Sequence, residues 1–387
     1  MRLMKKLMAT LTTGAVVASL ALGAASANAR DLRYAMGFPP GSDSDKAGQE
    51  YAAAVKKLTN GQLNVKVYPL SLLNFAETSA GLRDGIADIG YLLAPYFPAE
   101  YPHFNLLAES SMQLLTMDDR VRGKEGMAYV GALSEFVFTK CPECMNEFSK
   151  QNQVFTGAAG SSPYYLNCSK PVRSEAELKG KRLRVAGSHW SRWARAMGAQ
   201  PVTMSSNEAL EALKQGVVDC VVVSLPELTN LGLIEAVTDV TVQVPGGIFA
   251  GTAISQVNTK VWRSLTKEQR QAMLRAATVM PAYVPYVYHQ REKDVIELVK
   301  KRGGRVHQPD AALLQKTKDF AAQDMKTIVE FFAKTHGVKR GDELLAQFRP
   351  VLEKWVGLVQ TVDSREKLAD LYWNEIFSKV DANTYGM

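Results

Sequence analysis

The sequence predicts an α/β protein made of two similar lobes, and three observations support this fold class. Residues 31–94 alternate strand-like and helix-like segments, which is the βαβ pattern of a parallel sheet. The same alternation returns in residues 182–224. Two extended stretches, 152–172 and 246–258, then offer crossings between the lobes. Two crossings build each lobe from discontinuous chain, an architecture that hinges around a cleft.

The first lobe is expected to open with a strand and helix joined by the loop "PPGSDSD", which supplies caps for the helix. The turn "TNG" then leads into the next strand. The expected elements, in order, are a strand at 31–38, a helix at 46–58, a strand at 62–69, a helix within 74–85 and a strand at 86–94.

The second lobe is expected to repeat this order. Leu183 and Val185 alternate with arginines in the strand "RLRVAG", and Ser188 is expected to cap a helix over residues 189–197. A short strand "PVTM", a helix ended by Gly216 and the apolar strand "VVDCVVVS" follow. A strand flanked by helices usually lies in a sheet that is buried on both faces.

Two segments of the chain match each other in spacing, since each has a helix, a glycine terminus and a strand that begins near an aspartate. The matching positions are Glu77, Leu82, Gly85 and Asp88 in the first segment and Glu208, Leu213, Gly216 and Asp219 in the second. Internal duplication explains the match, but so does the ordinary form of any αβ unit. The sequence supports these two explanations about equally, and both predict two similar lobes.

The rest of the chain is expected to be mostly helical. A helical region follows residue 258 and runs to about residue 301, with breaks at Pro281 and Pro285. "GGRVHQPD" reads as a small strand and turn, and residues 310–380 read as amphipathic helix.

The first 29 residues have the pattern of a secretory signal peptide. Three basic residues precede an apolar stretch over residues 7–22, and Ala27-Asn28-Ala29 is a small-x-small cleavage pattern. A membrane anchor is the alternative, but the stretch is short and ends in Ala, Ser and Gly. We therefore expect a soluble, exported protein that begins near Arg30.

The charge of the chain disfavours nucleic acid as a partner. Of the net charge of +7, three positive charges lie in the signal segment, which leaves +4 for the mature chain. No run of Arg and Lys with interleaved aromatics occurs in the sequence. A mild positive field suits an anionic small molecule.

Four cysteines, at positions 141, 144, 168 and 220, are expected to form structural disulfides, because an even number in an oxidising compartment favours pairing. "CPEC" also resembles a redox motif or half of a zinc site, but no second cysteine pair stands at zinc-ribbon spacing. Three pairings are possible. Cys141–Cys144 with Cys168–Cys220 is the preferred one, and no metal or cofactor is expected.

Arg184 raises a question of its own, since it lies at the carboxyl end of a strand predicted to be buried. A buried arginine without a partner costs several kcal/mol, so a negative group must approach it. An internal carboxylate such as Asp219 is one candidate and a ligand carboxylate is the other. The residues alone leave these two readings about even.

Several motifs occur in a set order: "TNGQLNVKVYP", "GLRDGIADIGY", "ELKGKRLRVAGS", "MGAQPVTMSSNEALEALKQGVVD" and "LTKEQRQAMLRAA". Over roughly residues 31–310 they resemble the substrate-binding proteins of tripartite ATP-independent periplasmic (TRAP) transporters, the dicarboxylate-binding-protein-like family. The resemblance implies two α/β lobes, a hinge, a long helix that spans both lobes, and delivery of a carboxylate to a membrane permease driven by an ion gradient.

The resemblance also implies that Arg184 forms the salt bridge to the substrate carboxylate. A planar guanidinium donates two parallel hydrogen bonds to a carboxylate. The N-terminus of the helix at 189–197 is expected to add a favourable partial positive charge. The resemblance therefore favours a ligand rather than Asp219 as the partner.

The chain departs from the family where many members read "VDGQENP", because it reads "VDCVVVSLPE". The family's polar Asn falls on Val223, so a hydrogen bond to a polar substrate is expected to be lost. Trp190 is expected to line the cleft, whereas Trp193 is expected to be core, and Ser206 replaces an aromatic and leaves room. Together these residues predict a carboxylate with an apolar or aromatic body.

Further residues expected to contact the substrate are Asn167, Lys170, Ser224, Phe38 and Tyr91. The expected organisation is a signal peptide at 1–29, the first lobe at 30–152, the second lobe at 153–248, a return to the first lobe at 249–295, and the second lobe with C-terminal helices at 296–387.

The predicted function is that of a monomeric periplasmic solute-binding protein that delivers its ligand to the permease subunits of a TRAP transporter. A secreted enzyme that acts on a carboxylate is an alternative, but the five histidines are scattered and none lies in an HExxH or GxSxG context. A ligand-sensing protein for a membrane receptor is a further alternative, since it would use the same fold.

Overall fold

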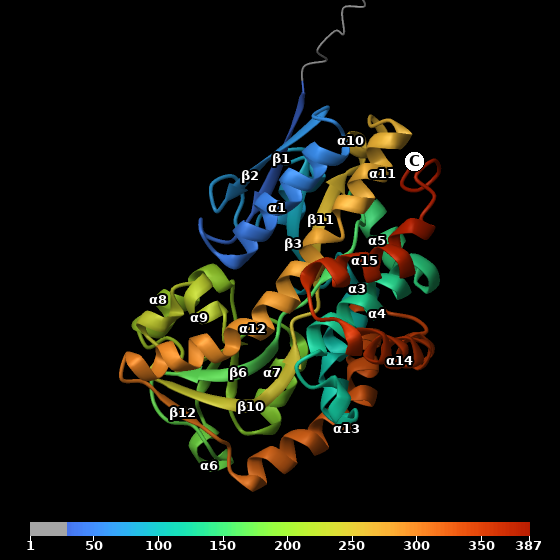
Figure 1. Ribbon diagram of the computed structural model, residues 1–387. Helices are drawn as coiled ribbons and strands as arrows, with labels where there is room; N and C mark the ends of the chain where they lie inside the picture. Colours follow the sequence, from blue (N-terminus) through green and yellow to red (C-terminus); the bar gives the residue numbers. More distant parts are fainter. Residues whose placement is uncertain (1–28) are drawn as a thin grey trace, which may run out of the picture.

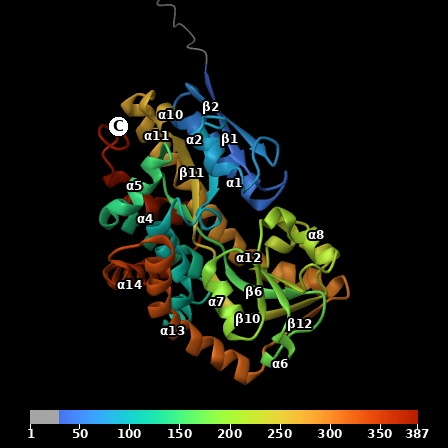
Figure 2. The same ribbon diagram turned by 180° about the vertical axis from the view of Figure 1, so that it is seen from behind.

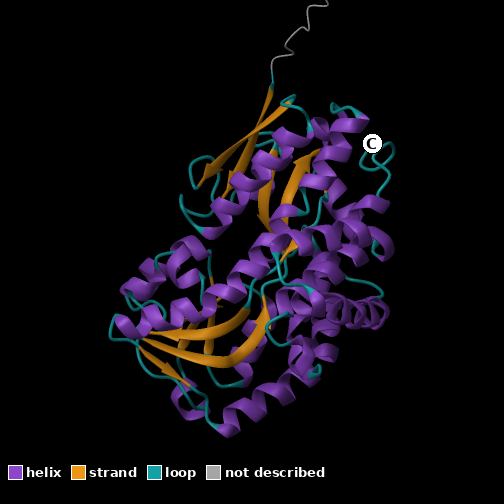
Figure 3. Cartoon of the chain, viewed as in Figure 1, coloured by secondary structure: helices purple, strands orange, loops and turns teal. Residues whose placement is uncertain are grey.

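A computed structural model describes residues 29–387 and shows two mixed β-sheets, each covered by helices (Figures 1 and 3). The predicted signal peptide falls, apart from Ala29, outside the described residues. Within residues 29–387 no helix is both long enough and apolar enough to cross a bilayer. The α/β fold class predicted from the sequence is confirmed.

The first lobe is built on one sheet, with strand order β2-β1-β3-β11-β4 and β5 paired to β11. Strands β1, β2 and β3 are parallel, and β11 runs antiparallel to β3. The strands are β1 (Arg30–Met36), β2 (Leu63–Pro69), β3 (Ile89–Leu93), β4 (Gln153–Val154), β5 (Ala158–Ala159) and β11 (Thr252–Asn258). The helices of this lobe are α1 (Asp43–Leu58), α2 (Thr78–Arg83), α10 (Thr259–Arg263) and α11 (Lys267–Ala276).

The second lobe is built on the other sheet, with strand order β12-β10-β6-β9-β7-β8. Strand β6 is antiparallel to both of its neighbours, whereas β7 is parallel to β8 and β9. The strands are β6 (Pro163–Cys168), β7 (Arg182–Val185), β8 (Gln200–Thr203), β9 (Cys220–Ser224), β10 (Asp239–Ile248) and β12 (Arg305–His307). The helices are α6 (Glu175–Leu178), α7 (Ser188–Ala196), α8 (Ala209–Lys214) and α9 (Glu227–Asn230).

The chain crosses between the two sheets at two short segments that lie side by side. Residues 160–162 join β5 to β6, and residues 249–251 join β10 to β11. The two crossings are hydrogen-bonded to each other, since the Ser161 amide donates to the Phe249 carbonyl at 3.0 Å and the Phe249 amide donates to Ser161 Oγ at 3.0 Å.

A single long helix, α12 (Val279–Lys301), runs between the two sheets in both views (Figures 1 and 2). The expected breaks at Pro281 and Pro285 are wrong, because the helix is continuous through both. Pro281 stands in the first turn, where a backbone N–H has no partner in the helix, and Pro285 is accommodated four residues later.

The two matching segments of the sequence have matching contacts. In the first lobe the Asp88 side chain accepts from the Arg33 amide at 2.8 Å and from Arg33 Nε at 3.0 Å. In the second lobe the Asp219 side chain accepts from the Arg182 amide at 2.8 Å and from Arg182 Nε at 3.2 Å. Each aspartate thus joins the start of one strand, β3 or β9, to its parallel neighbour, β1 or β7. Internal duplication and the ordinary form of an αβ unit both fit these contacts.

A layer of helices lies beside both sheets and contains α3 (Pro102–Glu109), α4 (Glu125–Lys140), α5 (Pro142–Lys150), α13 (Ala311–His336), α14 (Gly341–Leu358) and α15 (Arg365–Glu375). Strand β12 joins the second sheet as expected, but α14 packs on α4, and α15 packs on α12 and α4. The end of the chain returns to the first lobe, where Trp262 Nε1 donates to the Tyr385 carbonyl at 2.7 Å. Helices α14 and α15 therefore pack outside the second sheet, whereas α13 also packs on α7 and β10 of the second lobe.

Both expected disulfides are present, so the preferred pairing is confirmed. Cys168–Cys220 joins the adjacent antiparallel strands β6 and β9, and Cys141–Cys144 lies at the junction of α4 and α5. No described cysteine is free.

Candidate ligand-binding site

A cavity lies between the two lobes, next to the crossings. Its empty volume is about 440 Å³. Its wall is formed by Phe38, Phe75, Tyr91, Leu93 and Thr252 of the first lobe, Val284 and Tyr288 of α12, Tyr164, Ser206, Val223, Glu227 and Leu231 of the second lobe, and Gly160, Ser161 and Phe249 of the crossings.

Aromatic rings form much of this wall. Phe38 makes edge-to-face contacts with Phe75 and Tyr91, at centroid separations of 4.9 and 5.4 Å. On the other side, Tyr164 stacks with Phe249 at 6.3 Å. Val284 and Tyr288 stand four residues apart in α12 and therefore face the cavity together. The cavity suits a body with a flat apolar surface.

Arg184 is fully buried beside this wall and has no carboxylate partner. Its Nε and Nη2 atoms donate to the Met204 carbonyl at 3.1 and 2.9 Å, and Nη2 also lies 2.8 Å from Tyr96 Oη and 2.9 Å from Ser206 Oγ. The Nη1 atom is buried and has no hydrogen-bond partner among the described residues. The guanidinium therefore keeps an unused donor, and no carboxylate among residues 29–387 forms a salt bridge with it.

Asp219 is not the partner of Arg184. Its carboxylate binds Arg182 instead, with Oδ1 at 3.1 Å from Nη2. The two arginines stand two positions apart in β7 and lie in different environments, because the Arg182 side chain is 41% exposed and Arg184 is fully buried. The internal partner that the sequence left open is thereby excluded.

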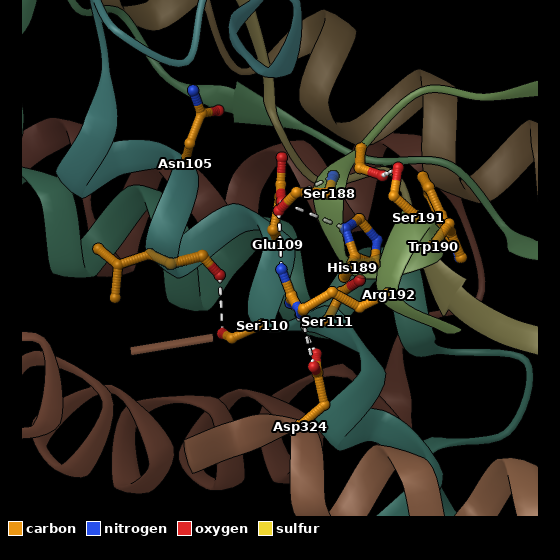
Figure 4. A network of polar contacts seen from close by, with 12 residues as sticks. Asn105, Glu109, Ser110, Ser111, Ser188, His189, Trp190, Ser191, Arg192 and Asp324 are labelled. Atoms are coloured by element: carbon orange, nitrogen blue, oxygen red, sulfur yellow. Dashed lines mark hydrogen bonds and ion pairs between the residues drawn. The ribbon is translucent and has the colours of Figure 1, made fainter. Parts of the chain in front are cut away.

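The N-terminus of α7 is occupied by another carboxylate (Figure 4). The helix begins at Ser188 with Gly187 as its N-cap, so the expected cap at Ser188 is wrong. The buried Glu109 of α3 accepts from the Ser188 amide at 3.0 Å and from the Ser188 hydroxyl. Because Glu109 already neutralises this helix end, the expectation that the helix N-terminus serves the ligand is not supported.

Further contacts hold Glu109 in its charged form. Burial acts to raise the pKa of Glu109, but contacts with His189, Ser188 and Arg192 outweigh burial, and the pKa lies below its usual value. Arg192 donates to Ser188 Oγ at 2.9 Å and forms a salt bridge with the buried Asp324 of α13 at 2.6 Å. This network joins α3, α7 and α13, and it is structural rather than part of the cavity wall (Figure 4).

Four of the predicted site residues line the cavity, namely Phe38, Tyr91, Ser206 and Val223. Arg184 does not line it but donates a hydrogen bond to Ser206 Oγ in the cavity wall. Trp190 lies one layer behind the wall, where it stacks on Tyr164 at 4.2 Å and donates from Nε1 to the Gly246 carbonyl at 2.9 Å. Trp193 is core, as expected, with Nε1 bound to Thr317 Oγ1 at 3.1 Å.

The other three predicted residues do not line the cavity. Asn167 is buried within the sheet and donates to the Val223 carbonyl at 3.0 Å. Ser224 is buried at the end of β9, opposite Tyr164. Lys170 is exposed and follows the carboxyl end of β6. Because β6 runs antiparallel to β9, the carboxyl end of β6 lies beside the start of β9. Glu227 and the cavity lie beyond the other end of β9.

Sequence reasoning missed Glu227, Tyr288, Phe75 and Phe249. A signal existed for Glu227, since it follows the buried strand β9, and ligands of open α/β sheets bind beyond the carboxyl ends of strands. Tyr288 lies within the long helix α12, and nothing in its local sequence separates it from core aromatics.

Glu227 is the only charged side chain among the described residues that line the cavity. Only 6% of its surface is exposed. Oε1 accepts from the Tyr288 hydroxyl at 2.8 Å, and Oε2 has no hydrogen-bond partner within residues 29–387. Burial raises the pKa of Glu227 to about 7, against the lowering effect of the Tyr288 hydrogen bond.

The described part of the chain contains no cluster of side chains with the composition of a metal site. Among residues 29–387, no group of three or more His, Cys, Asp or Glu side chains is arranged to hold a metal ion.

Comparison with known proteins finds several similar solute-binding proteins. A solute-binding protein of Albidiferax ferrireducens is 21% identical over 314 residues, which cover 80% of this chain and 89% of that protein. A TRAP solute-binding protein of Rhodoferax ferrireducens, solved with copurified benzoate, has a TM-score of 0.71 at 18% identity and covers 85% of this chain and 99% of its own. DctP7 of Bordetella pertussis, a solute receptor that binds pyroglutamic acid, has a TM-score of 0.68 at 22% identity and covers 83% of this chain and 100% of its own.

The family model of the bacterial extracellular solute-binding proteins of family 7 (DctP) matches residues 34–334, most of the chain. The solved structures share the fold with its two lobes. The resemblance seen in the sequence motifs is therefore confirmed: the chain belongs to family 7 of the bacterial extracellular solute-binding proteins, the solute receptors of TRAP transporters.

Proposed function

We propose that this protein captures an organic carboxylate with an apolar or aromatic body in the periplasm and delivers it to the permease subunits of a TRAP transporter. One observation carries the proposal: the fully buried Arg184, whose Nη1 donor has no partner among the described residues, contacts Ser206 in the wall of an aromatic cavity between the two lobes. A ligand carboxylate supplies both the missing charge and the missing acceptor. Benzoate and pyroglutamate, which similar receptors bind, are both carboxylates.

The fold supplies a way for the ligand to enter. We infer that the lobes separate by rotation about the two hydrogen-bonded crossings and α12, because these are the connections between the sheets. Ser161 and Phe249 of the crossings also line the cavity, so the ligand lies against the hinge.

The periplasmic location and the monomeric state belong to this proposal. Two disulfides fit an oxidising compartment, and the predicted cleavage leaves a chain that begins near Arg30. The intact mass and the light-scattering mass of protein recovered from the periplasm test both points. A mass that includes residues 1–29, or a stable dimer, would contradict them.

The ligand is tested by thermal shift followed by calorimetric titration. Benzoate, phenylacetate and pyroglutamate are compared with malate and succinate, and a ligand at 100 times its Kd adds about 2.7 kcal/mol of stability. We expect aromatic monocarboxylates to bind more tightly than malate or succinate. A preference for malate over every phenyl-bearing acid would reject the apolar body.

The role of Arg184 is tested with three variants. Arg184→Ala is expected to weaken binding by about 2–5 kcal/mol, the range for breaking a buried, hydrogen-bonded charge pair. Arg184→Lys keeps the charge but loses the planar fork, so it is also expected to bind poorly. Arg182→Ala is the matched control, since Arg182 is paired with Asp219 and lies away from the cavity wall. Equal affinity in Arg184→Ala and Arg182→Ala would contradict the proposed site.

A further inference from the structure

We infer that Glu227 forms a second polar subsite and that the ligand carries, besides its carboxylate, a hydroxyl or N–H group that donates a hydrogen bond to Glu227 Oε2. This inference rests on the proposed function, because Arg184 fixes the carboxylate end of the ligand. Glu227 begins α9, is more than nine-tenths buried, and is the charged side chain of the cavity wall.

The hydrogen bonds around Glu227 have fixed donors and acceptors, and they leave one carboxylate oxygen, Oε2, without a donor among the described residues. The Asp43 amide donates to Asn230 Oδ1 at 3.1 Å, which fixes the orientation of the Asn230 amide. Asn230 Nδ2 then donates to the Tyr288 hydroxyl at 3.1 Å, so the Tyr288 hydrogen is left for Glu227 Oε1, 2.8 Å away. Oε2 is buried without a donor, and an unsatisfied buried carboxylate oxygen is costly.

The charged neighbours of Glu227 act on its pKa in both directions. Asp43 of α1 acts to raise the pKa, and Arg184 of β7 and Arg291 of α12 act to lower it. The other titratable groups nearby are the tyrosines of the cavity wall, of which Tyr288 donates to the carboxylate. A ligand donor at Oε2 pairs with the ionised carboxylate, whereas a ligand acceptor would require a proton on Oε2.

The apolar strand next to Glu227 makes this subsite selective. Val223, the penultimate residue of β9, lines the cavity and offers no side-chain hydrogen bond. An acid with a donor at the right distance from its carboxylate therefore satisfies both Nη1 of Arg184 and Oε2 of Glu227. An acid of equal shape without the donor leaves Oε2 unpaired, and sites built on a buried hydrogen bond reject such analogues strongly.

The test compares matched pairs of ligands by calorimetric titration at pH 7.5. The 2-, 3- and 4-hydroxybenzoates are each paired with the fluorobenzoate of the same substitution, which is similar in size but has no donor. We expect the native protein to prefer the hydroxy acid by about tenfold or more at one ring position. Glu227→Leu is expected to reduce this preference to within about twofold while it still binds benzoate.

Two further variants control for folding and charge. Glu227→Gln keeps the shape of the side chain and is expected to lose most of the preference, because it turns one acceptor into a donor. Glu235→Gln is the matched control, since Glu235 is exposed and pairs with Lys214 outside the cavity. Melting temperatures identify any variant that fails to fold.

The dependence on pH gives an independent readout. Because the pKa of Glu227 is about 7 in the empty cavity, protonation competes with a donor ligand, and the affinity for the preferred hydroxybenzoate is expected to fall as the pH is lowered from 8 to 6. Glu227→Leu is expected to lose this dependence. An affinity that rises at low pH through Glu227 would show that the ligand presents an acceptor, and it would overturn the inference.

The outcomes separate this inference from the proposed function. Binding that needs Arg184 but does not distinguish hydroxy from fluoro acids, in the native protein and in Glu227→Leu alike, overturns the second subsite alone. Binding that survives Arg184→Ala, or no binding of any acid in the series, overturns the proposed function and this inference with it.

Discussion

Arg184 and Arg182 show how strongly the surroundings of one residue decide its role. Arg184 has neutral partners only, namely the Met204 carbonyl and the hydroxyls of Tyr96 and Ser206. Removing it deletes these hydrogen bonds, but it also removes an uncompensated buried cation, and the two effects oppose each other. We therefore expect Arg184→Ala to change the free energy of unfolding of the empty protein by less than about 1 kcal/mol.

Urea unfolding of the empty Arg184→Ala variant checks this expectation, alongside the titration of the same sample. A loss of several kcal/mol in unfolding with unchanged affinity would mean that Arg184 is part of the scaffold. The two measurements must therefore be read together, because each alone fits either role.

At the scale of residues, the sequence predicted the centre of the site better than its edges. The strand pattern placed Arg184 at the carboxyl end of β7 and Val223 near that of β9, and the structure brings both ends to the cavity. Lys170 follows the carboxyl end of its own strand, but β6 is antiparallel to β9, and strand direction cannot be read from local periodicity. Trp190 lies on the predicted helix but does not line the cavity, because Tyr164 stands between its ring and the cavity.

At the scale of elements, the two disulfides are expected to differ in their contribution to stability. Cys168–Cys220 closes a loop with a sequence separation of 52, and Cys141–Cys144 closes one with a separation of 3. Loop-closure entropy predicts about 4 kcal/mol for the long loop and about 2 kcal/mol for the short one. The double variant Cys168→Ala/Cys220→Ala is therefore expected to melt at a lower temperature than Cys141→Ala/Cys144→Ala.

Differential scanning calorimetry of the two double variants, each compared with the native protein, measures this difference. A larger loss in Cys141→Ala/Cys144→Ala would contradict the entropic argument and would point to a role of that bridge in the junction of α4 and α5. Both variants should keep carboxylate binding, because neither disulfide lines the cavity.

Elements with their own periodicity were predicted, and those that depend on distant partners were not. The alternating strands and helices of residues 31–94 and 182–224 appear in the structure in the expected order. The amphipathic character of α14 and α15 was visible, but an apolar helix face does not reveal which surface covers it. The continuity of α12 was missed, because Pro285 is accommodated inside the helix.

At the scale of the whole molecule, closure depends on polar contacts that cross the cleft. Asn207 Nδ2 of the second lobe donates to the Gly37 carbonyl of the first lobe at 2.9 Å. Tyr96, which follows β3 of the first lobe, reaches Arg184 and Ser206 of the second. The same arginine that is proposed to hold the ligand is therefore also held by the opposite lobe, which couples binding to closure.

Tyr96→Phe isolates this coupling. The hydroxyl accepts from the Ser206 amide at 2.9 Å and from Arg184 at 2.8 Å, and it lies 2.7 Å from Ser206 Oγ, whereas the ring packs on Phe75 at 6.3 Å. Phenylalanine keeps the ring contact and loses the hydrogen bonds, which exist only when the lobes are closed. A loss of about 1–1.5 kcal/mol in the closed state corresponds to a roughly tenfold weaker affinity.

The kinetics of Tyr96→Phe distinguish closure from direct contact with the ligand. Because the lost hydrogen bonds form after the ligand has entered, stopped-flow measurements are expected to show faster dissociation with a nearly unchanged association rate. Tyr286→Phe is the matched control, since its hydroxyl donates to the Asp363 carbonyl and does not line the cavity. A dissociation rate equal to that of the native protein would mean that the ligand-bound form closes without Tyr96, and the coupling through Arg184 would then have to be abandoned.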